Sequence, residues 1–144
     1  MSGGEPDLQN ERKQEAGRWL AVAVSDIRVI GLCLTADRPE LGIAAYHCQQ
    51  AAEKLIKGLL VMADAAFPKV HDLVQLGDLA ASHYPQWREL FAETGRMTVW
   101  GYAYRYPTLE EATEPSVPEV QAAVALIDRI ATCLRTLGII EQDK

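Results

Sequence analysis

Apolar residues recur at steps of three and four along most of the chain, which is the spacing of one face of an α-helix. The first run of this kind consists of Ala16, Leu20, Ala23, Ile27, Ile30 and Leu34. It ends at the segment TADRPE, because Pro39 disfavours a helical conformation for the residue before it. The pattern therefore predicts a long first helix that ends shortly before Pro39.

A second helix is predicted from about Pro39, because the Pro-Glu pair suits a first helical turn. Its apolar positions are Cys48, Ala52, Leu55, Leu59 and Met62, and further alanines widen this face so that another helix can approach closely. On the other side Glu53 can pair with Lys57, four residues later. We interpret this segment, which contains HCQQAAEK, as one wall of a helical bundle.

Two shorter helices are predicted next, over about 72–84 and about 87–104. Pro85 separates them, and the second of the two is less regular because it contains Gly95 and Gly101. A polar, proline-bearing connection then leads towards the last amphipathic segment of the chain.

The last helix is predicted to start at a capping box, Ser116 with Glu119, and to end near Gly138. No segment shows the alternation typical of a strand. The sequence thus predicts an all-α fold, an antiparallel bundle of four to five helices. Its predicted boundaries are a flexible N-terminal tail at 1–8, the bundle at 9–139 and a C-terminal tail at 140–144.

Charge and cysteine content narrow the functions that this fold could have. The formal net charge of −6 argues against general binding to nucleic-acid backbones, which requires a basic face. The three cysteines, Cys33, Cys48 and Cys133, show no C-x-x-C spacing, so we expect buried free thiols in a reducing cytoplasm. No apolar run is long enough to span a membrane, and the polar N-terminus carries no signal-peptide pattern.

His47 and Cys48 are adjacent in sequence, but neighbours on a helix point about 100° apart. The residues three and four positions after His47 are Gln50 and Ala51, and neither is a good metal ligand. Cys48 lies on the apolar face, which favours a core residue over a nucleophile. The sequence predicts no metal site and no cofactor.

His71 opens the third predicted helix, where it or Asp72 could cap the helix or where His71 could line a cleft as a general acid or base. His83 fits a last-turn histidine near a helix C-terminus. The segment WGYAYRYP combines three tyrosines and a tryptophan with Arg105, a group that could stack a base or form an interface. Glutamates that follow it would repel phosphate, so an interface is the favoured interpretation.

The segments AAYHCQQAAEKLIKGLLV, KVHDLVQL and YRYP, with an amphipathic last helix, resemble the HEPN domain (higher eukaryotes and prokaryotes nucleotide-binding). The resemblance extends from about Glu11 to Leu137. It implies a compact bundle of up to five helices that often dimerises and is often encoded beside a minimal nucleotidyltransferase in a toxin–antitoxin-type pair. The catalytically active members are metal-independent RNases marked by an Arg, four to six residues and then a His.

This chain departs from the RNase pattern, because all three histidines precede Arg96 and none follows an arginine at that spacing. No catalytic residue is therefore carried over. We expect a non-catalytic binding module, a cytoplasmic homodimer that binds a partner protein such as a minimal nucleotidyltransferase, or a nucleotide-like ligand. The alternative is an atypical RNase toxin in which His71 or His83 meets Arg105. The candidate ligand or interface positions are Arg105, Tyr106, His71, Gln50, Lys54 and Tyr104.

Overall fold

The computed structural model describes residues 4–105 and 114–143, and the side chains of 8–101 and 114–143. Within these residues all the regular elements are helices and none is a strand, which confirms the predicted all-α bundle. The elements are α1 (Gly4–Thr35), α2 (Leu41–Met62), α3 (Leu73–His83), the 3₁₀ turn η1 (Pro85–Trp87), α4 (Arg88–Thr94), the 3₁₀ turn η2 (Gly95–Met97), α5 (Thr98–Arg105) and α6 (Val117–Thr136).

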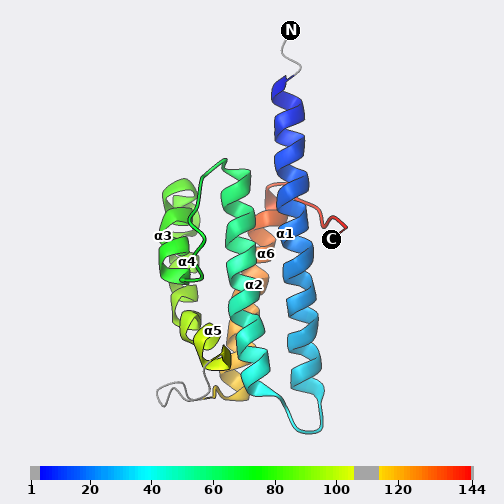
Figure 1. Ribbon diagram of the computed structural model, residues 1–144, viewed down its shortest axis with the longest axis vertical. Helices are drawn as coiled ribbons and strands as arrows, with labels where there is room; N and C mark the ends of the chain where they lie inside the picture. Colours follow the sequence, from blue (N-terminus) through cyan, green and yellow to red (C-terminus); the bar gives the residue numbers. More distant parts are fainter. Residues whose placement is uncertain (1–3, 106–113, 144) are drawn as a thin grey trace.

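The second helix, α2, lies in the centre of the bundle. Figure 1 shows α1 on one side of it, α3 to α5 on the other and α6 behind. Four fully or almost fully buried alanines let these neighbours approach α2 closely: Ala44, Ala45, Ala51 and Ala52. Of the apolar positions predicted for this helix, Cys48, Ala52, Leu55 and Leu59 are completely buried, whereas Met62 is half-buried. The predicted role of this segment as a wall of the bundle is confirmed.

Three of the predicted helix ends are confirmed by their capping contacts. At the start of α3, the Asp72 carboxylate accepts a hydrogen bond from the Val74 amide at 2.9 Å. Ser116 and Glu119 form the predicted capping box at the start of α6. At the end of α6, Gly138 has a φ of 83°, and the amides of residues 138 and 139 donate back to the last turn. The first helix begins at Gly4, inside the segment predicted as a tail.

The fourth predicted helix is divided into α4 and α5 by η2. The Thr94 hydroxyl donates to the Phe91 carbonyl at 2.6 Å, and the amide of Gly95 bonds instead to the carbonyl of Ala92, which tightens the turn. Gly95 also lies against α3, because a Cβ at this position would be 2.8 Å from Cγ2 of Val74. The chain can therefore bend here and stay close to α3.

The segment after α6 crosses back over α1 at Gly17. The amide of Gln142 donates to the Gly17 carbonyl at 3.1 Å, and Ile139 is buried beside this crossing. A Cβ at Gly17 would meet the Ile140 carbonyl oxygen directly and lie 2.6 Å from Cγ of Gln142. Only a glycine lets the two segments approach this closely. Among the described helices, none combines the length and apolar character needed to cross a bilayer.

The close approach at Gly17 generates a prediction about stability. Gly17→Ala should lower the free energy of unfolding by about 1–3 kcal/mol, because the added methyl group forces the C-terminal segment away from α1. Gly31→Ala is the matched control in the same helix, where a Cβ would meet nothing within 4 Å. It should raise stability by about 0.5–1 kcal/mol through helix propensity. Chemical denaturation of both variants tests this, and a stabilised Gly17→Ala would contradict the observed crossing.

Candidate functional site

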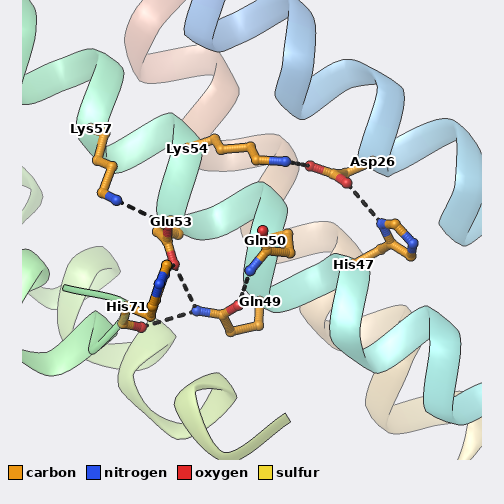
Figure 2. Close-up of polar contacts among 8 residues, drawn as sticks. All are labelled: Asp26, His47, Gln49, Gln50, Glu53, Lys54, Lys57 and His71. Atoms are coloured by element: carbon orange, nitrogen blue, oxygen red, sulfur yellow. Dashed lines mark hydrogen bonds and ion pairs between the residues drawn. The ribbon is translucent and has the colours of Figure 1, made fainter. Parts of the chain in front are cut away.

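A network of polar side chains runs along α2, and Glu53 is its most buried carboxylate, with 5% of its side chain exposed. One carboxylate oxygen of Glu53 accepts from Nζ of Lys57 at 3.0 Å, and the other accepts from Nε2 of Gln49 at 3.1 Å and from Nδ1 of His71 at 2.9 Å (Figure 2). Gln49 also donates to the backbone carbonyl of His71 at 3.0 Å. Two side chains of α2, Glu53 and Gln49, therefore hold His71, the residue before the N-cap of α3, by both its ring and its backbone.

Burial and hydrogen bonding act in opposite directions on the Glu53 carboxyl. Burial alone would raise its pKa, because it penalises the charged form. The hydrogen bonds from Lys57, His71 and Gln49, together with the positive charge of Lys57, outweigh this penalty and hold the pKa of Glu53 below its ordinary value. Glu53 is therefore ionised at neutral pH, and Nδ1 of His71 carries a proton that it donates to the carboxylate.

The ammonium group of Lys57 is also buried, and it lies between two aromatic rings. Its Nζ is 5.9 Å from the ring centroid of Trp19 on α1 and 6.0 Å from that of Phe67 in the segment after α2. Ring faces attract a cation, so these two rings add to the stabilisation that Glu53 provides. The contact joins α1, α2 and the segment leading to α3.

Asp26 of α1 is the centre of a second, separate group of polar contacts with α2. Its side chain is 9% exposed, with one oxygen 2.7 Å from Nδ1 of His47 and the other 2.8 Å from Nζ of Lys54. Gln50 lies between the two centres and donates to Oε1 of Gln49 at 2.7 Å (Figure 2). Among the described residues, every buried side-chain nitrogen and oxygen has a hydrogen-bond partner. Both groups are thus satisfied by the chain itself.

Three of the candidate positions from the sequence belong to these two groups: His71 and Gln50 to the Glu53 group, and Lys54 to the Asp26 group. Tyr104 and Arg105 lie in the last turn of α5, but their side chains are outside the described residues, as is the whole of Tyr106. The same helix touches the Glu53 group at Gly101, where a Cβ would be 3.0 Å from Oε1 of Gln49. The sequence interpretation missed Asp26 and Gln49, although a lone aspartate beside the apolar face of the first helix was a usable signal.

The remaining histidine and the cysteines have the predicted structural positions. His83 is exposed in the last turn of α3. Cys48 is completely buried, and burial raises the pKa of its thiol to about 12, so it is not a nucleophile at neutral pH. All three cysteines are free and buried. In the parts of the chain that the structure describes, no three His, Cys, Asp or Glu residues are grouped to hold a metal ion.

A pocket of about 240 Å³ lies between the α4–α5 region and α6. Three of its lining residues are buried and apolar, Met97, Ala123 and Leu126, whereas the lining glutamates and arginine are exposed. The lining residues whose side chains the structure describes are Glu93, Arg96, Met97, Trp100, Glu119, Ala122, Ala123 and Leu126. We call it the arginine pocket. Trp100 was part of the aromatic group that the sequence singled out, whereas Arg96 was not chosen as a site residue.

The Glu53 centre generates a prediction about stability. Glu53→Gln should lower the free energy of unfolding by roughly 3–5 kcal/mol at neutral pH, because the buried Lys57 ammonium loses its counter-charge. Adding Lys57→Met should recover part of this loss, since the thioether can pack between the rings of Trp19 and Phe67. Asp78→Asn, at an exposed position of α3, is the control and should change stability by no more than about 0.5 kcal/mol.

The same centre gives stability a defined dependence on pH. Because the pKa of Glu53 is lower in the folded protein than in the unfolded chain, its contribution is complete above the unfolded value of about 4.3 and is lost as the pH falls through the folded value. The stability difference between wild type and Glu53→Gln should therefore shrink as the pH is lowered below about 4.3. Urea titrations at a series of pH values measure this, and a difference that grows in acid would show that Glu53 is not held as an anion.

Comparison with known proteins supports the resemblance seen in the sequence. No curated protein and no solved structure matches this chain. The family model of the HEPN domain, in contrast, matches residues 7–137, a range that contains α2 to α6 and nearly all of α1. The chain belongs to the HEPN domain family.

Proposed function

We propose that this chain is a non-catalytic HEPN binding module that forms a homodimer and binds a partner protein. The partner that membership of the family suggests is a minimal nucleotidyltransferase, in a toxin–antitoxin-type pair. One observation carries the non-catalytic assignment. The pocket that contains an arginine has no histidine among its described lining residues, and the two paired histidines belong to the two groups of polar contacts with α2.

This separation matters because RNA cleavage in the active members needs an arginine and a histidine in one cleft. Here no histidine follows an arginine at the required spacing in the sequence. Arg96 shares its pocket with the carboxylates of Glu93 and Glu119, which would repel a phosphodiester. The chemistry available in the arginine pocket is therefore recognition rather than acid–base catalysis.

One contact favours the alternative of an atypical RNase. Glu53 holds Nδ1 of His71, which leaves Nε2 of the same ring as a potential proton acceptor, and the His71 side chain is 54% exposed. A general base also needs a group nearby that stabilises the developing negative charge. Lys57, the cation that shares the Glu53 carboxylate with His71, is instead paired with Glu53 and buried. The arrangement therefore favours a role for His71 in holding the start of α3.

A nucleotide-like ligand is the second candidate for the binding function, and the arginine pocket favours it. Trp100 offers a face for stacking a planar ring, Arg96 offers hydrogen-bond donors, and the buried apolar residues offer a dry surface. The volume of about 240 Å³ lies below the roughly 300–1,000 Å³ of pockets for drug-sized ligands. It suits a nucleobase or nucleoside better than a whole nucleotide with its phosphates.

The binding proposal predicts the outcome of a cleavage and partner experiment. The purified chain should leave short single-stranded RNA intact, and it should form a complex of defined mass with a minimal nucleotidyltransferase from the same genome. Gel analysis of labelled RNA and light scattering of the mixture measure the two results. RNA cleavage that disappears in His71→Gln while the fold is kept would establish the RNase alternative instead.

The arginine pocket predicts ligand-dependent stability. Adenosine or AMP in excess should raise the melting temperature of the chain, because a ligand that binds only the folded state stabilises it. Arg96→Gln and Trp100→Ala should each reduce this shift, whereas Arg88→Gln, an exposed position outside the pocket, should not. Equal shifts in all three variants would place the ligand elsewhere, and no shift with any nucleoside would leave the partner protein as the ligand of this module.

A further inference from the structure

The arginine pocket combines an apolar floor with a rim that carries charges of both signs. The floor is formed by buried side chains, and the rim by the exposed side chains of Glu93, Arg96 and Glu119. A nucleoside would use the donors of Arg96 and the ring of Trp100, but it has no positive charge for the two carboxylates. A ligand that fits the whole pocket must therefore pair with a guanidinium group and with carboxylates at the same time.

The three charged groups of the rim are available to a ligand. None of the ion pairs among the described residues includes Glu93 or Arg96. Glu119 uses Oε1 in the capping box, where this oxygen accepts from the amide and the hydroxyl of Ser116 at 3.1 and 3.0 Å. Its second oxygen, Oε2, forms no hydrogen bond with any residue that the structure describes. A ligand can therefore bind at the rim without first breaking an internal ion pair.

The spacing of the rim charges indicates a ligand whose own charges lie close together. Glu93 and Arg96 are three residues apart on successive helical turns of α4 and η2, and side chains at this spacing are neighbours with about 5–6 Å between their Cβ atoms. Glu119 faces them from α6. An α-amino acid carries its ammonium and its carboxylate on one carbon, so adjacent side chains can bind both groups.

We propose that the arginine pocket binds a free α-amino acid with an apolar side chain. The carboxylate of the ligand pairs with the guanidinium of Arg96, and its ammonium pairs with the carboxylates of Glu93 and Glu119. The carboxylates that repel a phosphodiester thus have a role in binding, because they attract an ammonium group. The inference goes beyond the proposed function, since an amino acid is neither a partner protein nor a nucleotide-like ligand.

The floor of the pocket determines the side chain of the ligand. Met97 and Leu126 are buried there, and the half-buried ring of Trp100 lies beside them in the lining. An aliphatic or aromatic side chain gains free energy by covering this surface, whereas a charged one would lose its hydration. The volume of about 240 Å³ is small for a drug-sized ligand and suits a single amino acid. A peptide fits less well, because its ammonium and its carboxylate are at opposite ends of the molecule.

Analogues of one amino acid test the two charge contacts separately. L-Leucine, L-methionine and L-phenylalanine are titrated into the full chain by isothermal titration calorimetry. L-Phenylalaninamide lacks the carboxylate and N-acetyl-L-phenylalanine lacks the ammonium, so each should bind roughly ten- to a hundredfold more weakly than L-phenylalanine. D-Phenylalanine has the same charges and size and should also bind more weakly, because three different contacts around one carbon distinguish enantiomers.

Each analogue has a matching variant of the protein. Arg96→Gln should lose the preference for L-phenylalanine over its amide, because the partner of the carboxylate is gone. The double variant Glu93→Gln, Glu119→Gln should lose the preference for L-phenylalanine over its N-acetyl derivative. Glutamine at position 119 can keep the capping box, and all three positions are exposed, so the fold should be retained. Glu89→Gln, at an exposed position of α4 outside the described lining, is the matched control and should leave every preference unchanged.

The outcomes separate this inference from the proposed function. Equal binding of L-phenylalanine and its amide, an unchanged preference in Arg96→Gln, or no binding of the three amino acids at millimolar concentration would each overturn the amino-acid site. Adenosine binding that depends on Arg96 and Trp100, without amino-acid binding, would keep the nucleoside candidate and overturn this inference alone. The complex with a partner protein is measured by its mass and does not depend on either ligand.

Discussion

The ionised carboxylate of Glu53, buried in the middle of the bundle, is the contact on which the arrangement of the later helices depends. Taking a charge out of water costs several kcal/mol, so this side chain is tolerated only where donors surround it. Its donors come from α2 itself and from His71, the residue that precedes the N-cap of α3. A charge that needs His71 as a partner fixes where the chain returns to α2 after Met62. Because the buried charge of Glu53 must be paired with His71, the segment between α2 and α3 has a defined path.

The position of His71 also determines where α3 and α5 begin. Asp72 caps α3 immediately after His71, and the amide of Leu73 donates to Oγ1 of Thr98 at 3.0 Å. The start of α3 is therefore bonded to the start of α5. Gly101, one turn later in α5, packs against the side chain of Gln49, which also holds the His71 carbonyl. A closed set of contacts joins α2, α3 and α5, and it places the α4–α5 region where it forms the arginine pocket with α6.

Periodicity and capping rules predicted most of the fold, because they depend on residues close together in sequence. The second helix and the ends at Asp72, Ser116 and Gly138 are of this kind. The contacts of His71, in contrast, join residues that are far apart in the sequence. Its carboxylate partner is 18 residues earlier, and their meeting depends on the path of the connection between two helices. The division of the fourth predicted helix was missed for a similar reason. It depends on the hydrogen bond of the Thr94 hydroxyl and on the close contact between Gly95 and Val74 of α3.

The paired histidines and the arginine pocket lie in different parts of the bundle. His47 and His71 are held at Nδ1 by the buried carboxylates of Asp26 and Glu53, whereas the arginine pocket lies between the α4–α5 region and α6. The described lining of the pocket offers the donors of Arg96 and the ring of Trp100, but no histidine. It therefore lacks the arginine–histidine pair that marks the RNases of this family, and this separation favours recognition over cleavage.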